Sequence, residues 1–286
     1  MTRRPHVVPW ACLACLACLL VGLAACGGSP APAGAESPTS RVQGMVDIGD
    51  RSLLLRCRGS GGPTVVLEAG LADDLSTWDA VQAPVSARTR VCAYNRANIG
   101  VSDAAPKPRT TTDMVDDLEH LLAAADEPPP YVLVGFSFGG LVMQQFAASH
   151  PDDVAGVVLV ESNHPDEQRQ FESHLTRRQV QEDRAEVAGN PEGVDVFSSF
   201  DEVRSAGPLP DVPLVVVTAG VPEEWPPGWN ARVFNRLRSR QQADLATLVP
   251  GGRQMFARQS GHRVPDEQPE VVVRALNDVL DRAGSG

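Results

Sequence analysis

The chain has 286 residues, of which 42% are hydrophobic and 21% are charged, and its formal net charge is −11 at neutral pH. These proportions are typical of a soluble globular domain and exclude a disordered chain or a protein with several membrane spans. An acidic balance gives no general attraction to nucleic acid or to anionic lipid, so we expect no nucleic-acid partner.

The N-terminus has the pattern of an export signal. Arg3 and Arg4 give a positive start, residues 7–25 are almost entirely apolar or small, and Cys26 follows directly. Such a pattern is typical of a secretory signal peptide, and the four residues that end at Cys26 resemble a bacterial lipobox, in which the cysteine becomes acylated. We therefore predict a signal peptide over residues 1–25 and lipidation of Cys26. The alternatives are an ordinary cleaved signal or a single uncleaved anchor helix.

A segment rich in Gly, Pro, Ala and Ser follows the cysteine and has no apolar periodicity, which predicts a flexible tether. The predicted organisation is a signal peptide (1–25), a lipidated cysteine with its linker (26–41) and a folded domain (42–286). This organisation implies an exported protein that is held on the extracytoplasmic side of the cell membrane by its N-terminal acyl chains.

The folded domain is predicted to begin with a hairpin and to continue as strands that alternate with helices. Apolar runs predict strands at residues 42–48, 52–57, 64–68, 90–94, 131–134, 157–160, 213–217 and, with a weaker pattern, 254–257. Helical spacing predicts a helix capped at Thr112-Asp113 and ending near residue 125, and further helices at 141–149 and 269–282. This alternation predicts a mostly parallel sheet covered on both faces.

About 50 charge-rich residues separate the strand that ends before Glu161 from the strand that begins at Pro213. A connection of this length is too long for an ordinary loop, so we expect it to form a helical cap at about residues 162–211.

Residues 135–139 read Gly-Phe-Ser-Phe-Gly and match the nucleophile-elbow pattern Gly-x-Ser-x-Gly. The elbow needs small residues on either side because the chain turns sharply from a strand into a helix and larger side chains would collide. The pattern falls directly after a predicted strand and before an apolar helix, which favours a real elbow over a chance match in a loop. Ser137 is therefore the candidate nucleophile.

A serine hydroxyl needs a base to react at neutral pH. Of the six histidines, His262 lies in a polar loop between the last predicted strand and the C-terminal helix. The order serine, acid, histidine along the chain is the order of such elbow enzymes. His262 is therefore the candidate base, and the alternative is a histidine in a surface loop.

Residues from about 42 to 282 resemble the α/β-hydrolase superfamily, and within it the small serine esterases and lipase-like members. The similarity rests on motifs that occur in the family's order: the opening hairpin, residues 67–71, residues 94–97 with Gly100 and Ser102-Asp103, the elbow, and Gly261-His262 with residues 268–270. The resemblance implies an eight-stranded, mostly parallel sheet with helices on both faces and a helical cap. It implies no metal and no organic cofactor.

The resemblance also implies the oxyanion hole and the acid of a catalytic triad. The oxyanion donors would be the backbone N–H groups of Phe138 and of Leu71, although many relatives carry His-Gly where this chain has Ala69-Gly70. The acid follows either the sixth or the seventh strand in this family. Glu161 stands at the first place and is preferred, because a strand end controls its position.

The second place holds only Glu223 and Glu224, which remain alternatives for the acid. The family topology sets the second strand beside the fourth, which would bring Cys57 and Cys92 together as a possible disulfide. Two buried free thiols are the alternative.

The predicted function is hydrolysis of small-molecule carboxylic esters by a serine–histidine–acid triad through an acyl-enzyme. An amide or lactone hydrolase with the same triad is one alternative. Another is a non-catalytic surface lipoprotein that keeps the fold as a binding module. The binding-module interpretation would be favoured if Glu161, Glu223 and Glu224 all lay far from His262.

Overall fold

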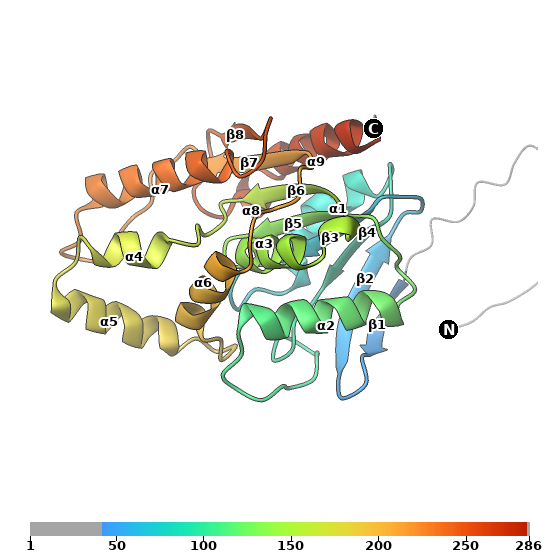
Figure 1. The fold of residues 1–286 in the computed structure, drawn as a ribbon, viewed down its shortest axis with the longest axis horizontal. Coiled ribbons are helices and arrows are strands. Elements are labelled where there is room, and N and C mark those ends of the chain that lie inside the picture. Colours follow the sequence, from blue (N-terminus) through green and yellow to red (C-terminus); the bar gives the residue numbers. More distant parts are fainter. Residues whose placement is uncertain (1–41, 285–286) are drawn as a thin grey trace, which may run out of the picture. The chain divides into compact units, whose positions relative to one another are not determined.

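Eight strands form a single sheet, and helices pack on both of its faces (Figure 1). The computed structural model describes residues 42–284. The strands are β1 (Val42–Asp47), β2 (Ser52–Arg58), β3 (Thr64–Glu68), β4 (Val91–Tyr94), β5 (Tyr131–Phe136), β6 (Val154–Val160), β7 (Leu214–Ala219) and β8 (Arg253–Ala257). The predicted signal peptide, Cys26 and the linker lie outside the described residues.

The strand order is β1-β2-β4-β3-β5-β6-β7-β8. β1 and β2 are antiparallel to each other and β2 is antiparallel to β4, whereas every pair from β4 to β8 is parallel. The predicted eight-stranded, mostly parallel sheet is therefore confirmed. The carboxyl ends of the parallel strands meet at one edge, where loops can bring distant residues together.

The helical elements are η1 (Leu75–Trp78), α1 (Asp79–Val85), α2 (Thr111–Ala124), α3 (Gly139–Ser149), η2 (Pro151–Asp153), α4 (Glu167–Glu172), α5 (Arg177–Ala188), α6 (Val196–Ser205), α7 (Ala231–Leu245), α8 (Val264–Glu267) and α9 (Pro269–Ala283), where η1 and η2 are 3-10 helices. α2 starts earlier than predicted, after Thr110. Asp113 is not the N-cap but lies in the first turn of α2. Its carboxylate accepts a hydrogen bond from Thr110 N at 2.9 Å and completes a capping box.

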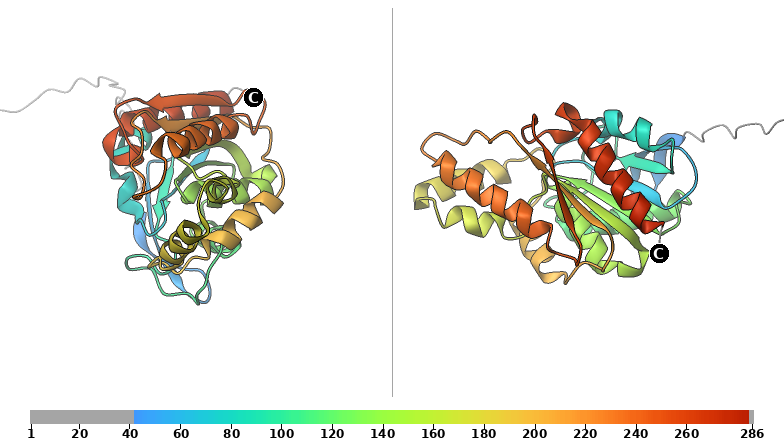
Figure 2. Two further views of the ribbon diagram at one scale, coloured as in Figure 1. Left: turned by 90° about the vertical axis from the view of Figure 1, so that its left-hand side faces the viewer. Right: turned by 90° about the horizontal axis from the view of Figure 1, so that it is seen from above.

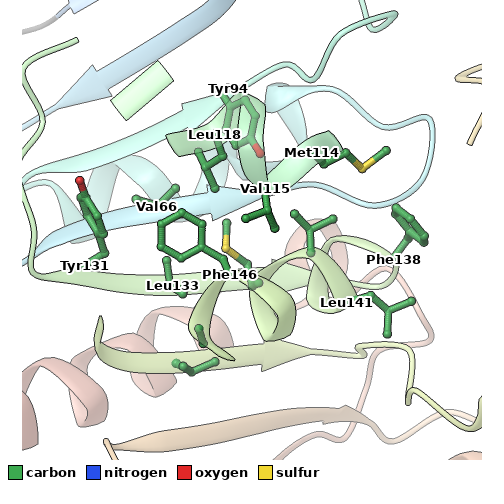
Figure 3. Packing of buried hydrophobic residues seen from close by; sticks show 14 of the residues in the cluster. Val66, Tyr94, Met114, Val115, Leu118, Tyr131, Leu133, Phe138, Leu141 and Phe146 are labelled. Carbon is green, nitrogen blue, oxygen red and sulfur yellow. The ribbon is translucent and has the colours of Figure 1, made fainter. Parts of the chain in front are cut away.

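Successive residues of the central strands alternate between two hydrophobic layers. In β5, Val132 and Val134 pack with α1 and α9, whereas Leu133 packs with α2 and α3. Figure 3 shows the second layer, in which side chains of α2 and α3 meet Val66 and Leu133 of the sheet. Figure 2 shows α9, in red, lying along the sheet. Because both faces are covered, strands such as β3 and β5 are buried throughout.

Helices α4, α5 and α6, here called the cap helices, fill the long segment between β6 and β7 (Figure 1). α6 packs on α2 and α3 and buries Val196, Phe200 and Val203. α5 contains no buried residue. The cap helices are therefore anchored mainly through α6, while α5 stays largely in contact with solvent.

Cys57 and Cys92 face each other on β2 and β4, and a disulfide joins them. Both cysteines are buried. In the part of the chain that the structure describes, the one cluster of possible metal ligands consists of these two cysteines and Glu127, and its sulfurs are bonded to each other. Within residues 42–284, no helix has the length and apolar character required to cross a membrane.

Candidate active site

Ser137 lies at the turn between β5 and α3, as the elbow pattern predicts. Its backbone has φ +53°, a left-handed conformation that side-chain-bearing residues seldom adopt. A Cβ on Gly135 would lie 2.5 Å from the carbonyl oxygen of Gly139, and one on Gly139 would lie 2.4 Å from that of Ala69. Both glycines are therefore required so that strand, turn and helix can approach one another.

His262 faces the elbow from the loop between β8 and α8. Its Nε2 atom lies 3.0 Å from Ser137 Oγ, within hydrogen-bonding distance. The imidazole also packs against the ring of Phe136, with centroids 5.0 Å apart. The loop itself is held by Glu267, whose carboxylate accepts a hydrogen bond from Gly261 N at 2.7 Å. Ser137 and His262 therefore have the geometry of a nucleophile and its base.

Glu161 follows the last residue of β6, and one oxygen of its carboxylate lies 3.5 Å from His262 Nδ1. Its other oxygen accepts a hydrogen bond from Ala219 N at 2.6 Å. Burial by itself raises the pKa of Glu161, but the contact with His262, the charge of Arg238 and the Ala219 N–H outweigh it and hold the pKa below its ordinary value. Glu161 is thus buried and ionised beside the imidazole.

The two alternative acids lie farther from His262. Within the described residues, Glu161 is the carboxylate in ion-pair contact with His262, whereas Glu223 has its contact with Arg238, 3.6 Å away, and Glu224 has none. The condition that would favour a non-catalytic module, three carboxylates distant from His262, is therefore not met.

Arg238, on α7, is a cation that the sequence did not indicate. Its Nη2 atom lies 2.9 Å from Glu161 Oε2 and 3.2 Å from His262 Nδ1, and its other nitrogens reach Glu167 and Glu223. Burial tends to lower the pKa of Arg238, but the three carboxylates raise it above its ordinary value. Arg238 therefore ties the candidate acid to a cap helix through Glu167 and to the loop after β7 through Glu223.

Arg238 and His262 also share one acceptor, Glu161 Oε2. If Nε2 is to accept the proton of Ser137, Nδ1 must carry the proton of the neutral ring. Glu161 Oε2 is then the acceptor for both the Nδ1–H of His262 and the Nη2–H of Arg238. Glu161 thus holds two donors, and one of them is the base.

The predicted oxyanion residues lie next to the nucleophile. Phe138 is the N-cap of α3, where the backbone N–H groups have no acceptor inside the helix. Leu71 follows Gly70 in the turn after β3. Leu71, Phe138 and Ser137 line one cavity of about 370 Å³. A Cβ on Gly70 would lie 2.8 Å from Asp73 Oδ2 and 3.2 Å from the ring of Phe136, so a side chain at this position would displace the Asp73 carboxylate.

The turn after β3 is held through its main chain by Arg96. The guanidinium donates to the carbonyl oxygens of Ala69 and Gly70, at 2.8 and 2.7 Å. Glu192, from the loop before α6, accepts from Ala72 N at 3.0 Å and from Arg96 Nε at 2.5 Å. These contacts orient the peptide groups around Leu71 without requiring a side chain at position 69, where many relatives carry histidine.

Arg96 is itself buried between two carboxylates, Glu192 and Glu68. Burial raises the pKa of Glu192, but the charge of Arg96 more than compensates and leaves the pKa lowered. For Glu68, the effect of burial is larger than the opposing effects of the Arg96 charge and the Tyr94 hydrogen bond, so the pKa is raised. The motif around Arg96 marked it in the sequence without showing its role, and Glu192 carried no signal because it lies 96 residues away in the chain.

Comparisons with known proteins agree with this fold. The family described as the alpha/beta hydrolase fold matches residues 63–215. YqjL of Bacillus subtilis (strain 168) is 26% identical over 237 residues, which cover 78% of this chain and 85% of YqjL. The enol-lactonase from Burkholderia xenovorans LB400 is 20% identical, with a TM-score of 0.62 over 83% of this chain and all of that one.

A thermophilic esterase from Thermogutta terrifontis is 21% identical, with a TM-score of 0.58 over 85% of this chain and 99% of that one. At such identities these structures support the fold alone. The family match, by contrast, spans more than half of the chain and includes the elbow, Ser137 and Glu161. This chain therefore belongs to the α/β-hydrolase family.

Proposed function

We propose that the protein is a serine hydrolase that cleaves small-molecule carboxylic esters through an acyl-enzyme. The observation that carries the proposal is the 3.0 Å contact between Ser137 Oγ and His262 Nε2, with the ionised Glu161 behind the imidazole. A nucleophile, a base and an orienting acid at the end of a rigid sheet form the constellation that acyl transfer requires.

In the first half of the reaction, Ser137 Oγ adds to the ester carbonyl carbon as His262 Nε2 removes its proton. The carbonyl oxygen gains negative charge, which the N–H groups of Phe138 and Leu71 stabilise. The bond to the leaving alcohol then breaks, and His262 returns the proton to the alcohol oxygen. Glu161 balances the positive imidazolium throughout.

In the second half, water replaces the alcohol. His262 removes a proton from water as its oxygen adds to the acyl carbon, and the same two N–H groups stabilise the second oxyanion. The bond to Ser137 Oγ then breaks, His262 protonates the serine, and the acid departs. In each half of the reaction His262 gains one proton and then gives it up, so no further acid or base is needed.

A fluorophosphonate probe tests the nucleophile. The purified protein is treated with the probe and its intact mass is measured beside Ser137→Ala and Ser149→Ala. Ser149 is an exposed serine at the C-terminal end of α3, the helix that follows Ser137. One adduct on the wild type and on Ser149→Ala, absent from Ser137→Ala, is expected. An adduct that survives Ser137→Ala, or a folded wild type that stays unlabelled, contradicts the proposal.

Esters, lactones and amides with the same acyl group then separate the chemical alternatives. Ester and lactone cleavage requires only expulsion of an alkoxide, whereas an amide must receive a proton from His262 before the amine can leave. We expect esters to react faster than matched amides. Faster cleavage of the amide would establish the amide-hydrolase alternative.

We also propose that the domain is exported and anchored through acylated Cys26, on the basis of the charged start, apolar run and lipobox-like residues of the sequence. Metabolic labelling of cells with an alkyne-bearing fatty acid tests this. The wild type should incorporate the label and Cys26→Ser should not. Equal labelling of the two would contradict acylation at this cysteine.

A further inference from the structure

The cavity that contains Ser137 is strongly acidic. Among the described residues that line it are five carboxylates and no arginine, lysine or histidine. The carboxylates belong to Glu167, Asp183, Glu186, Glu223 and Glu224. Because low-dielectric walls focus the field of such charges into a cavity, a substrate that enters experiences a negative potential.

Two of these carboxylates contact a cation inside the protein. Glu167 and Glu223 line the cavity but lie 3.4 and 3.6 Å from nitrogens of Arg238, whose charge they share with Glu161. Within residues 42–284, the other three carboxylates form no ion pair. Asp183, Glu186 and Glu224 are therefore the lining carboxylates whose charge no ion pair within the described residues offsets.

These three carboxylates come from two sides. Asp183 and Glu186 are three residues apart on α5, so they share one face of that helix. Glu224 lies in the loop after β7. Burial raises the pKa of Asp183 and outweighs a hydrogen bond from Gln168 that lowers it, and the charges of Glu172 and Glu186 raise this pKa further. A cation between the two sides would relieve this repulsion.

Aromatic rings complete the same cavity. Trp225 and Trp229 both line it and stack with centroids 5.8 Å apart and ring planes 10° from parallel. Trp225 also contacts Phe171, which lines the cavity as well. The faces of aromatic rings attract cations, and tryptophan does so most strongly. Carboxylates and indole rings together complement a weakly hydrated cation better than a neutral or anionic group.

We propose that the ester substrate carries a cationic group, an alkylated ammonium, and that Asp183, Glu186 and Glu224 determine this specificity. The inference rests on the proposed ester hydrolysis at Ser137. The carboxylates act on binding and on the approach of the substrate, and they take no part in bond breaking. An ester with a carboxylate in the same position is correspondingly disfavoured.

Two matched pairs of esters test the proposal, because the cation can lie on either side of the ester bond. Acetylcholine is compared with 3,3-dimethylbutyl acetate, and the p-nitrophenyl ester of 4-(trimethylammonio)butanoate is compared with that of 5,5-dimethylhexanoate. Each pair differs only in carbon for nitrogen and hence in one charge. We expect kcat/KM to favour the cation in at least one pair by about tenfold or more, and the ratio to decline as salt is added.

The variants assign the preference to the cavity. The triple variant Asp183→Asn, Glu186→Gln, Glu224→Gln should lower the ratio of the two kcat/KM values several-fold towards one, while Trp225 and Trp229 remain in place. Glu182→Gln is the matched control, because Glu182 is an exposed carboxylate on the same helix and does not line the cavity. The control should keep the wild-type ratio.

Failure of this inference differs from failure of the proposed function. A protein that accepts the fluorophosphonate and cleaves esters with no preference for the cation in either pair overturns the inference and leaves ester hydrolysis standing. A preference that the triple variant retains undiminished overturns the assignment to these carboxylates. A folded protein that neither binds the fluorophosphonate nor cleaves any of the four esters contradicts the proposed function and the inference with it.

Discussion

The turns that follow the strands and the cap helices both line the cavity at Ser137, but the strands and the cap are packed very differently. β3 and β5 are buried along their whole length, and β6 is buried except at its second residue. Each of these strands leads directly into a turn that holds a residue of the site. α5 buries none of its residues and contributes two carboxylates to the cavity. Ser137 and Glu161 therefore directly follow the most constrained backbone, whereas Asp183 and Glu186, assigned to substrate choice, sit on the least constrained helix.

This contrast has a physical basis. Triad geometry must be kept within fractions of an ångström, which requires side chains held by packed strands and second partners. Recognition of a charged substrate acts over a longer range and tolerates movement of the recognising groups. Substitutions near the sheet should therefore affect chemistry and stability strongly, and substitutions on α5 should affect selectivity with small effects on stability.

The largest effect is expected for Glu161→Gln. The amide can donate to Nδ1 and so hold His262 in the tautomer whose Nε2 carries a proton and cannot accept one from Ser137. We expect kcat to decrease on the order of 10⁴-fold. The measurement is steady-state hydrolysis of p-nitrophenyl acetate, with circular dichroism as the check on folding. Glu223→Gln is the control, and a comparable loss in that variant would move the acid to the loop after β7.

Arg96→Met should cause the largest loss of stability. It leaves Glu68 and Glu192 buried without their cation, and removing one member of a buried ion pair costs about 3–5 kcal/mol. Arg184→Met is the matched change on α5, where the guanidinium pairs with Glu172 at 2.6 Å near the surface and the expected cost is about 0–1 kcal/mol. Urea unfolding of the two variants measures the difference. Equal losses would contradict the contrast between sheet and cap.

Much of the sheet side could be predicted from the sequence because its signals are local. Val65 to Leu67 form an apolar run, and the glycines around Ser137 mark a turn that only small residues allow. Glu161 could be chosen because it directly follows a strand, and it is the carboxylate that contacts His262.

The groups that the sequence did not show act through contacts between distant segments. Arg238 is one of four arginines in α7, and nothing local distinguishes it from the other three. Glu192 and Asp183 lie in a charge-rich segment where many acidic residues are simply exposed. Their roles depend on how α5, α7 and the turn after β3 fold against one another, and no short pattern encodes that arrangement.

The contribution of Glu161 to stability should depend on pH, and its sign follows from the direction of the pKa shift. We expect this effect to be smaller than the two above. Its pKa in the folded protein is lower than its ordinary value of 4.5, so the unfolded chain binds the proton more tightly. The stabilisation is complete above pH 4.5 and is lost as the pH falls through the folded-state pKa. We expect the stability difference between wild type and Glu161→Gln, measured by urea unfolding, to narrow across this range. Parallel curves would contradict this assignment.

The smallest expected effect has the opposite sign and lies on the cap. The pKa of Asp183 is raised, so its stabilising contribution exists below the ordinary value of 3.8 and is lost as the pH rises through the folded-state pKa. Asp183→Asn should therefore stabilise the protein at neutral pH, by less than about 1 kcal/mol because solvent screens this half-buried group.

Asp195 provides the comparison for Asp183, because it is also an aspartate of the cap segment but has a lowered pKa. Its carboxylate accepts from Ser198 N at 3.0 Å at the start of α6. Asp195→Asn should lower the midpoint of urea unfolding slightly at neutral pH, whereas Asp183→Asn should raise it. If Asp183→Asn also weakens the preference for the cationic ester, the protein retains at this position a charge that costs stability. Such a cost is expected of a residue kept for binding, and a destabilised Asp183→Asn would remove that argument.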